Sequence, residues 1–378
     1  MSDAERPIDM AKLQGSEEYL NRSYVSQSTY VDDLISVIIP VRNGERVIGR
    51  TLQSVLNQSH QDIEVLVVDD GSIDSTLVMV KELAAHEPRV RYYSGPQAGV
   101  AAARNRGIAQ ARGEFIAPVD ADDLWHKDKL LLQLNALRKA GARTGVAYCW
   151  SVTIDEMDST TADKMGEQVR LEGDVLPAML ERNFLGNAST PLIRHACLDL
   201  VGGYDPSLYL QGTQGAEDWK LYLALAEVCD FALVPRCLVG YRKSQNSMSA
   251  NFVAMQRSMD LVRQWARKRW PLLAEKHGKQ ERYFTYQYLG NTAVENNSFG
   301  HAGLFFARAI QARPAQLVRL STVNFMLRML GRVLGLRRLA KKTRTPMTFW
   351  EFVEQIDSGL EVSDSHKTSV RELANGKG

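Results

Sequence analysis

Cysteine is scarce in this chain of 378 residues, and its spacing excludes the usual thiol-based sites. The cysteines form no CxxC pair and no Cys/His cluster; they are Cys149, Cys197, Cys229 and Cys237. This pattern argues against a structural zinc site and against a disulfide scaffold. We therefore expect buried free thiols in a protein of a reducing compartment.

Long apolar runs are also absent. No stretch reaches the roughly 18 apolar residues that a membrane-spanning helix requires, so the sequence predicts no such helix. Residues 1–34 are polar, carry acidic side chains and lack the apolar segment of a signal peptide. We expect a cytoplasmic protein, either free or held peripherally on the cytoplasmic face of a membrane.

The chain carries no large excess of one charge. Its net charge is only +2, so the molecule as a whole is not expected to bind nucleic acid, and a charged partner must meet a local patch. Acidic residues are missing between Asn296 and Trp350, and segment 315–345 mixes apolar with basic side chains. Such a segment suits an anionic membrane surface; the alternative is a core helix with a solvated basic face.

Two common nucleotide-binding motifs are missing too. The chain has no GxxxxGK[ST] sequence, which a P-loop NTPase needs, and no GxGxxG after its first predicted strand. A sugar-phosphate nucleotidyltransferase would need a glycine-rich loop with a basic residue at that point. The segment Arg42-Asn43-Gly44 is a poor version of such a loop.

What the chain does contain is a regular alternation of strand and helix patterns. Amphipathic helical patterns separate a series of β-branched apolar runs. These runs predict strands at 35–41, 63–68, 90–93 and 114–119. The repeated alternation indicates a three-layer α/β fold with a largely parallel sheet.

The rest of the chain gives a coarser prediction. The stretch "LWHKDKLLLQLNALRKA" predicts a helix over 124–140, and the polar residues 155–172 predict an exposed loop. Later residues are mostly helical in pattern. We expect three parts: a polar tail over 1–34, the α/β domain over 35–245, and a helical C-terminal region over 246–378.

Acidic residues gather where two of the predicted strands end. Asp69 and Asp70 follow the second strand, and Asp120, Asp122 and Asp123 follow the fourth. Parallel strands end at one edge of a sheet, so both groups should meet at one ligand site. Two like charges about 4 Å apart repel by about 4 kcal/mol at an effective dielectric of 20, and a hard cation removes that repulsion. The pattern predicts Mg²⁺ or Mn²⁺ bound together with a nucleotide diphosphate.

Three longer stretches resemble, in order, the family 2 inverting glycosyltransferases. They are "SVIIPVRNGERVIGRTLQSVLNQSHQDIEVLVVDDGSIDST", "GVAAARNRGIAQARGEFIAPVDADDLWHKDKL" and "VGGYDPSLYLQGTQGAEDWKLYLALA". The resemblance covers 35–245 and implies the GT-A fold, a Rossmann-like, mainly parallel sheet flanked by helices, here with a helical C-terminal extension. It also implies transfer of a sugar from a nucleotide-diphosphate sugar, a UDP-sugar in the first place, to a carbohydrate or lipid-linked acceptor. Such enzymes build cell-surface polysaccharide, lipopolysaccharide or glycolipid.

The resemblance gives roles to individual residues. Asp122 would be the main metal ligand, with Asp120 on the metal or the ribose. The remaining donor-binding residues would surround the nucleotide; they are Pro40, Val41, Arg42, Glu45, Asp70 and Arg104. Asp218 would be the general base, and Glu217 and Trp219 would shape the acceptor side.

Two departures from the family pattern bear on the donor. Arg42 stands where the family usually has a tyrosine that stacks on the base; a guanidinium can also stack on a planar ring, but the preference for uridine is then open. Residues 244–249 supply no histidine, which the family often has there for the metal.

Asp123 has no family role, and we expect it to begin the following helix and to be replaceable at modest cost.

Two alternative functions stay open at this point. One is a non-catalytic nucleotide-sugar-binding or interaction protein, and the other is a sugar-phosphate nucleotidyltransferase. The presence of Asp70, Asp120, Asp122 and Asp218 together favours the enzyme. Asp218 could instead serve only the dipole at a helix N-terminus, although Glu217 would do so equally well.

Overall fold

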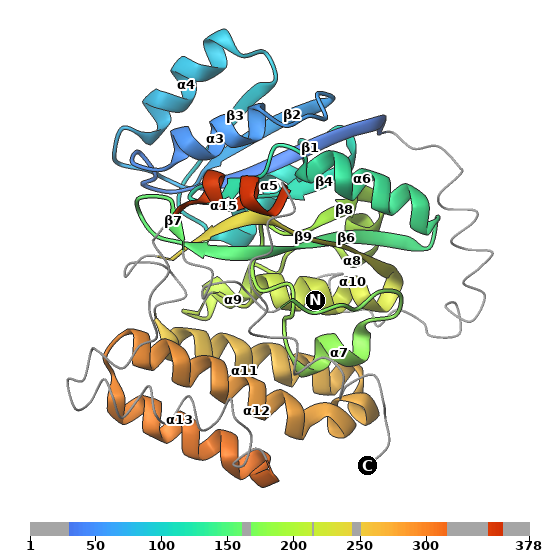
Figure 1. Cartoon of the computed structure of the whole chain (residues 1–378), viewed down its shortest axis with the longest axis vertical. Helices are drawn as coiled ribbons and strands as arrows, with labels where there is room; N and C mark the ends of the chain where they lie inside the picture. Colours follow the sequence, from blue (N-terminus) through green and yellow to red (C-terminus); the bar gives the residue numbers. More distant parts are fainter. Residues whose placement is uncertain (1–29, 161–167, 214, 244–250, 316–346, 358–378) are drawn as a thin grey trace.

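The computed structural model describes residues 30–160, 168–213, 215–243, 251–315 and 347–357. The strands are β1 Val31–Val41, β2 Ile63–Asp69, β3 Val90–Ser94, β4 Gly113–Pro118, β5 Leu124–Trp125, β6 Thr144–Ile154, β7 Ser159–Thr160, β8 Leu192–Arg194, β9 Asp230–Arg242 and β10 Met347–Thr348. The helices are α3 Ile48–Leu56, α4 Thr76–His86, α5 Val100–Ile108, α6 Lys129–Ala140, α7 Leu176–Glu181, α8 His195–Val201, α9 Ser207–Leu210, α10 Glu217–Val228, α11 Phe252–Arg269, α12 Pro271–Glu295, α13 Phe299–Ala312 and α15 Phe349–Asp357. Figure 1 shows one large sheet between helices, with α11, α12 and α13 forming a separate layer beneath α10.

The large sheet has the strand order β3-β2-β1-β4-β8-β6-β9-β5. Its first half is parallel: Val37 of β1 lies opposite Val65 of β2 on one side and Ala117 of β4 on the other. Its second half is mixed, because β8 runs antiparallel to β4 and β6, while β6 and β9 are parallel. The parallel half brings the ends of β1, β2 and β4 to one edge, as expected from the sequence.

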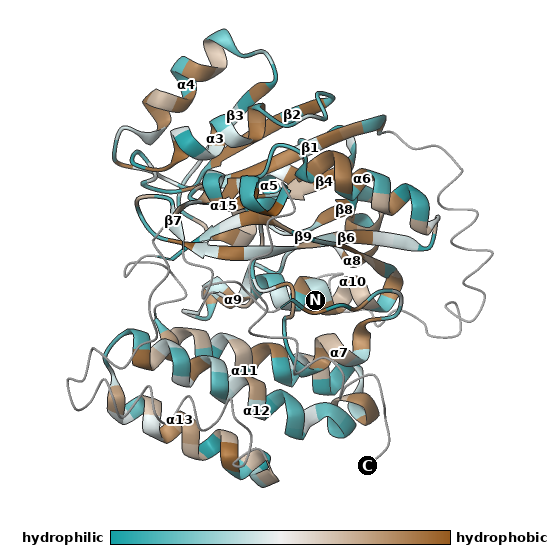
Figure 2. Cartoon of the chain, in the orientation of Figure 1, coloured by the Kyte–Doolittle hydropathy of each residue, from teal (hydrophilic) through white to brown (hydrophobic). Residues whose placement is uncertain are grey.

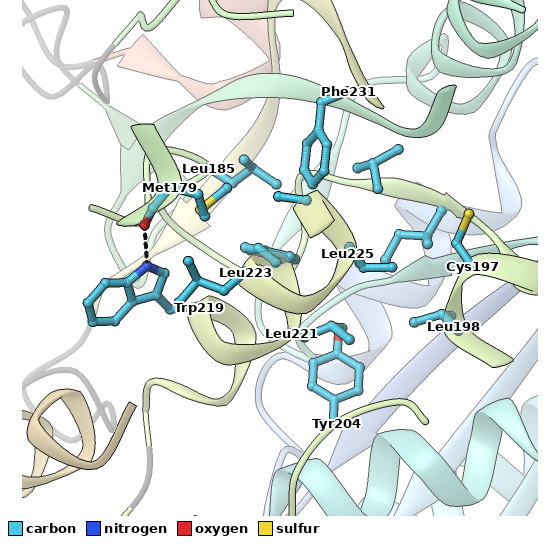
Figure 3. Packing of buried hydrophobic residues seen from close by; sticks show 14 of the residues in the cluster. Met179, Leu185, Cys197, Leu198, Tyr204, Trp219, Leu221, Leu223, Leu225 and Phe231 are labelled. Carbon is cyan, nitrogen blue, oxygen red and sulfur yellow. Dashed lines mark hydrogen bonds between the residues drawn. The ribbon is translucent and has the colours of Figure 1, made fainter. Parts of the chain in front are cut away.

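The sheet separates two apolar cores. Alternating residues of β1 point to opposite faces, so Val37 and Ile39 belong to one core with residues of α3 and α6, whereas Ile38 belongs to the other core with residues of α5 and α10. Figure 2 shows β1 and β2 largely in the brown of hydrophobic residues, and Figure 3 shows Leu221, Leu223 and Phe231 in the core around α10. Each fully buried aliphatic or aromatic side chain contributes about 1.5–3 kcal/mol, which makes this central region the stable scaffold of the site.

Several predicted boundaries were wrong at the ends of elements. β1 begins at Val31, so the last residues of the expected tail belong to the sheet. The helix predicted over 124–140 begins only at Lys129. Before it, Leu124 and Trp125 form β5, an edge strand that pairs with β9. Both side chains are buried there.

The C-terminal region 246–378 divides into parts with different neighbours. α11, α12 and α13 pack together through buried residues that include Leu289, Ala293 and Phe305. Residues 316–346, which hold nearly all of the basic segment 315–345, lie outside the described residues. None of the helices in the described part of the chain has both the length and the hydrophobicity needed to cross a bilayer.

The last described segment returns to the α/β domain. β10 pairs antiparallel with β7, which lies in the stretch predicted as an exposed loop. The next helix, α15, buries Phe349 and Phe352 completely against a cluster that includes Val152 and Ile154 of β6. Residues 347–357 are therefore part of the sheet domain and not of the separate helical layer.

Candidate active site

The carboxylate of Asp70 fixes the loop after β2 to the start of α5. Its two oxygens accept hydrogen bonds from the backbone amides of Ala98 and Gly99, at 2.8 and 2.9 Å. Asp69 accepts from the amide of Ser72 within its own turn. Both aspartates are buried, and Gly71 takes a left-handed conformation at a point where a side chain would come close to the backbone of Gln97. The loop is thus held rigidly at the sheet edge.

The loop after β1 lies beside it. Pro40 and Val41 are buried, and the carbonyl of Val41 accepts a hydrogen bond from the Asp70 amide at 2.9 Å. Glu45 accepts from the amide of Ser75 at 3.0 Å, so its carboxylate holds the start of α4. Arg42 is exposed, which leaves its guanidinium accessible to a ligand at this edge.

Arg104 connects the two sides of the site. It lies on α5 with 1% of its surface exposed, and it donates to Asp120 at 2.5 Å and to Glu217 at 3.3 Å. Its guanidinium also lies over the ring of Tyr204, 5.0 Å from the centroid. Burial alone would lower the pKa of Arg104, but Asp120, Tyr204 and Glu217 together raise it, so this group stays charged. The loop after β4 that carries the Asp120-Ala121-Asp122 (DxD) sequence, hereafter the DxD loop, and the start of α10 are therefore both tied to the buried cation of Arg104.

Asn105, the next residue along α5, holds the turn before α9. Its side-chain oxygen accepts from the amide of Tyr204 at 2.8 Å, and its side-chain nitrogen donates to the Tyr204 carbonyl at 2.7 Å. Gly203 takes a positive φ there, and a side chain at that position would collide with Asn105. Asn105 was not among the predicted site residues, although it lies in one of the three stretches that resemble the family.

Ser189 and Arg242 hold the DxD loop through hydrogen bonds to its backbone, and neither was among the predicted site residues. The Ser189 hydroxyl accepts from the amide of Asp120 at 2.9 Å. Arg242, at the end of β9, donates from Nε to the backbone oxygen of Asp122 at 2.7 Å. Arg242 ends the largely apolar strand β9, which is the only signal that the sequence offered for it, and the structure buries it with 3% of its surface exposed.

The prediction for Asp123 was wrong. Its side chain is fully buried; it accepts a hydrogen bond from the Ser189 hydroxyl at 2.5 Å and another from the Arg242 amide at 2.8 Å. Burial, followed by the nearby charges of Asp122 and Asp120, raises the pKa of Asp123 well above its usual range. Asp123 does not begin a helix but connects its own loop to Ser189 and to the end of β9, so its replacement should be costly.

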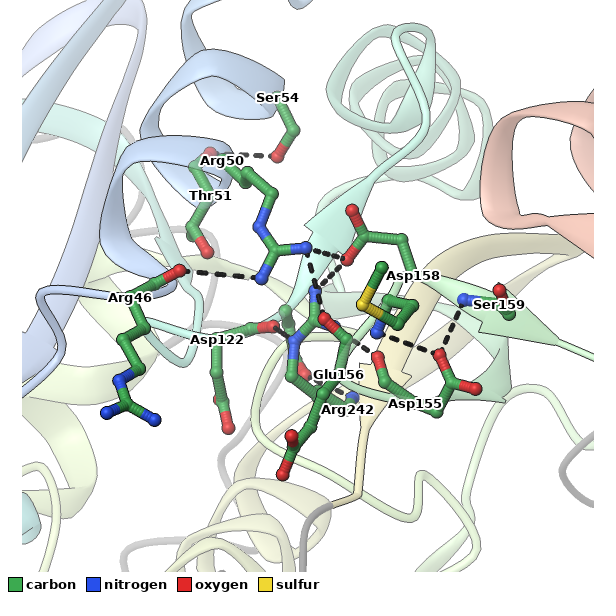
Figure 4. A network of polar contacts seen from close by, with 12 residues as sticks. Arg46, Arg50, Thr51, Ser54, Asp122, Asp155, Glu156, Asp158, Ser159 and Arg242 are labelled. Atoms are coloured by element: carbon green, nitrogen blue, oxygen red, sulfur yellow. Dashed lines mark hydrogen bonds and ion pairs between the residues drawn. The ribbon is translucent and has the colours of Figure 1, made fainter.

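Asp122 presents its carboxylate away from these supports. Figure 4 shows its backbone oxygen facing Arg242, whereas its side chain leaves the network. Burial and then the charge of Asp120 raise the pKa of Asp122 to about 6, and Arg242 opposes them. Two adjacent carboxylates that repel each other in a partly buried loop are a fitting pair of oxygen ligands for Mg²⁺ or Mn²⁺.

A second possible metal-binding group among the described residues consists of His126, Asp128 and Asp357. Its charges are already balanced, because Asp357 pairs with Arg236 and Asp128 lies 2.6 Å from the amine of Lys127. Both nitrogens of His126 are engaged as well, Nε2 with Asp357 at 3.0 Å and Nδ1 with the Asp128 amide at 3.1 Å. The DxD pair therefore fits a cation better than this group does.

Asp218 begins α10 next to Glu217. Its carboxylate accepts a hydrogen bond from the Asn183 side chain at 3.1 Å. Burial, and then the charge of Glu217, raises the pKa of Asp218 to about 7, while Arg104 opposes the shift. A carboxylate with this pKa is suited to accept a proton near neutral pH. Trp219 lies in the core, where its indole donates to the Met179 carbonyl at 2.8 Å (Figure 3).

Comparison with known proteins finds similarity to glycosyltransferases and to a polysaccharide synthase. The profile of "Glycosyl transferase family 2" matches residues 36–185. An uncharacterised glycosyltransferase of Haemophilus influenzae is 32% identical over 169 residues, which are 43% of this chain and 68% of that protein. A chondroitin synthase of Escherichia coli is 30% identical over 198 residues, 52% of this chain, and the match spans only 27% of its own length.

Solved structures show the same fold. TarS 1-349 of S. aureus in complex with UDP-GlcNAc has a TM-score of 0.53 at 17% identity, covering 80% of this chain and 92% of that one. The mannosyltransferase PcManGT from Pyrobaculum calidifontis, in complex with GDP-Man and Mn²⁺, has a TM-score of 0.51 at 16% identity, covering 87% and 97%. The likeness confirms the predicted GT-A architecture, with a mainly parallel sheet flanked by helices and a helical C-terminal region.

Proposed function

This chain belongs to glycosyltransferase family 2, and we propose that it is a metal-dependent, inverting glycosyltransferase. One observation carries the proposal: buried Arg104 joins Asp120 of the DxD loop to Glu217, the neighbour of Asp218. Through it, a loop suited to a metal-bound diphosphate and a carboxylate suited to proton removal share one site. The pKa values of Asp122 and Asp218, raised to about 6 and about 7, support an enzyme over an interaction protein, because perturbed carboxylates gather at catalytic sites.

The donor would be a nucleotide-diphosphate sugar, with a UDP-sugar as the first candidate. Asp120 and Asp122 would hold Mn²⁺ or Mg²⁺, which when bound stabilises the negative charge of the diphosphate leaving group. Asp70, Pro40 and Val41 would border the nucleoside, and exposed Arg42 would stack on its base. The TarS structure contains UDP-GlcNAc and the PcManGT structure contains GDP-Man and Mn²⁺, which supports a donor of this class.

Asp218 would act as the general base. The acceptor oxygen forms a bond to the anomeric carbon on the face opposite the diphosphate, the bond from that carbon to the diphosphate oxygen breaks, and the acceptor proton moves to Asp218. Proton removal by a positioned base contributes roughly 10²- to 10⁴-fold to such a step. Neither Glu217 nor Trp219 is exposed. They would shape the acceptor side indirectly, Glu217 through its ion pair with Arg104 and Trp219 through its packing in the core.

The acceptor would be a carbohydrate or a lipid-linked sugar, in the synthesis of cell-surface polysaccharide, lipopolysaccharide or glycolipid. The match to a chondroitin synthase supports a polysaccharide-related role. The basic segment 315–345 would bring the enzyme to an anionic membrane surface on the cytoplasmic side.

Calorimetric titration with UDP- and GDP-sugars, with and without Mn²⁺, tests the proposal together with an assay for released nucleoside diphosphate. We expect one donor to bind in a metal-dependent way and to be turned over. Binding without any turnover, across a panel of acceptors, would favour the interaction protein. Release of pyrophosphate from a nucleoside triphosphate would favour a nucleotidyltransferase.

A further inference from the structure

Asp158 lies outside the residues so far assigned to the reaction, yet it connects the DxD loop to the C-terminal segment. We infer that Asp158 and Arg242 are positioning residues for the metal-binding loop, and that the segment Met347–Asp357 keeps Asp158 in place. The inference rests on the proposed role of Asp122 as a metal ligand.

The first link runs from the C-terminal segment to Asp158. β10 pairs with β7, which begins directly after Asp158, and the amide of Phe349 donates to the Asp158 carbonyl at 2.8 Å. Asp158 itself has a φ of 61°, a left-handed conformation that non-glycine residues rarely adopt. The strand pair and the Phe349 hydrogen bond therefore hold a residue whose backbone conformation needs external support.

The second link runs from Asp158 to two buried or half-buried arginines. One carboxylate oxygen of Asp158 pairs with Arg50 of α3 at 2.8 Å and also with Arg242 of β9 (Figure 4). The side chains of Arg242 and Asp158 are 2% and 15% exposed, so solvent screens this pair little. Arg242 further donates to the carbonyl of Asp155 in the same turn.

The third link runs from Arg242 to the DxD loop. Its Nε donates to the Asp122 carbonyl at 2.7 Å, and its amide donates to the Asp123 carboxylate at 2.8 Å. The guanidinium of Arg242 thus has one side on Asp122 and the other on Asp158. Loss of the Asp158 charge would leave that guanidinium poorly held, and the loop that carries the Asp122 ligand would lose its fixed position.

The C-terminal segment is anchored firmly enough to transmit this constraint. Phe349 and Phe352 are 0% exposed, and the Phe349 ring lies so close to Gly240 that a side chain there would approach it to 3.0 Å. At the other end of α15, Asp357 pairs with Arg236 and with His126. The segment is fixed by both apolar packing and charge.

The test is binding of Mn²⁺ with UDP, and in parallel with GDP, to the full chain by calorimetry. Asp158→Asn keeps the size of the side chain and tolerates the left-handed backbone, but it removes the charge that Arg242 and Arg50 share. We expect the dissociation constant of the Mn²⁺–nucleotide complex to rise roughly 10-fold. The matched control is Glu227→Gln, which removes a similarly buried carboxylate paired with Arg269 far from this loop; it should leave binding unchanged.

Phe352→Ala tests the C-terminal segment separately. It should weaken Mn²⁺–nucleotide binding and speed hydrogen exchange in residues 155–160. If the segment acts through Asp158, combining Phe352→Ala with Asp158→Asn should weaken binding no further than Asp158→Asn alone. Additive losses would overturn the role of the segment.

Unchanged binding by Asp158→Asn, with its unfolding midpoint no lower than that of Glu227→Gln, would overturn the positioning role itself. Failure of the unaltered protein to bind either Mn²⁺–nucleotide complex would instead count against the proposed function. The two failures are therefore distinguishable.

Discussion

Arg104 is the residue on which the two halves of the candidate site depend. It is a buried cation between Asp120 and Glu217, and its charge opposes the rise in the pKa of Asp218. The acids in this loop therefore differ in role according to what supports them. Asp123 is satisfied by Ser189 and Arg242, whereas the carboxylate of Asp122 points away from the supporting network.

Replacing Asp122 with alanine should abolish metal-dependent nucleotide binding. The remaining carboxylate, Asp120, already pairs with Arg104 and offers a weaker site for a divalent cation. Titration of the variant with UDP and GDP should give the same weak affinity with and without Mn²⁺. A dependence on Mn²⁺ equal to that of the unaltered protein would show that the cation binds elsewhere.

Asp123→Ala should destabilise the fold. It would leave the Ser189 hydroxyl and the Arg242 amide without their buried acceptor, a loss of about 2–4 kcal/mol in the free energy of unfolding. Denaturant unfolding measures this value. The control is Glu87→Ala, which breaks a surface ion pair with Arg89 worth at most about 1 kcal/mol. Equal destabilisation by the two variants would contradict the structural role of Asp123.

Turnover should fall on the acidic side of neutrality. Asp218 must be deprotonated to accept a proton, and its pKa is raised to about 7, so kcat/KM should drop about tenfold per pH unit below that value. Asp122, with a pKa raised to about 6, should lose its affinity for the cation at lower pH. Both shifts are upward, so the folded state binds more protons than the unfolded chain between about pH 4 and 7, and the contribution of these groups to stability decreases as pH rises. A flat profile of kcat/KM from pH 5 to 8 would contradict the assignment.

At the scale of elements, local patterns predicted well where one segment determines its own structure. The β-branched runs at 35–41 and 63–68 became β1 and β2, because each side chain is buried on one face or the other of the sheet. β4 ends at Pro118, a residue that has no amide to donate to the sheet. β5 could not be predicted this way, since Leu124 and Trp125 are held by β9, more than a hundred residues later.

The segment containing Asp158 was missed for a related reason. Residues 155–172 are polar, which is typical of a loop, and nothing nearby in the sequence indicates that β10 pairs there. Asp158 and Arg242 matter through contacts between distant parts of the chain. By contrast, the roles proposed for Asp122 and Asp218 came from motifs of the family and could be assigned before the fold was known.

Deletion of 315–345, with β10 and α15 retained, should release the protein from vesicles that contain anionic lipid. The deleted stretch carries basic and apolar side chains without any acid, so its loss removes the expected attraction. Vesicle sedimentation at low and high salt measures the effect, and nucleotide binding should be unaffected. Undiminished vesicle binding by the deletion variant would rule out membrane attachment through this segment.

At the scale of the whole molecule, the candidate site depends on both halves of the sheet and on a segment near the C-terminus. The parallel half of the sheet brings Asp70 and the DxD loop together, and α10 supplies Asp218 from the mixed half. The segment Met347–Asp357 returns from the C-terminal region to pack against the second half of the sheet. The molecule thereby connects its C-terminal segment to the loop proposed to hold the donor.

The central claim is that Asp122 serves the donor and Asp218 the acceptor proton. The most direct test measures donor binding and nucleoside diphosphate release side by side, with Mn²⁺, for the unaltered protein and for Asp218→Asn. We predict that the variant binds the donor within about twofold of the unaltered protein while turnover falls roughly 10²- to 10⁴-fold. Near-normal turnover by Asp218→Asn would contradict the account.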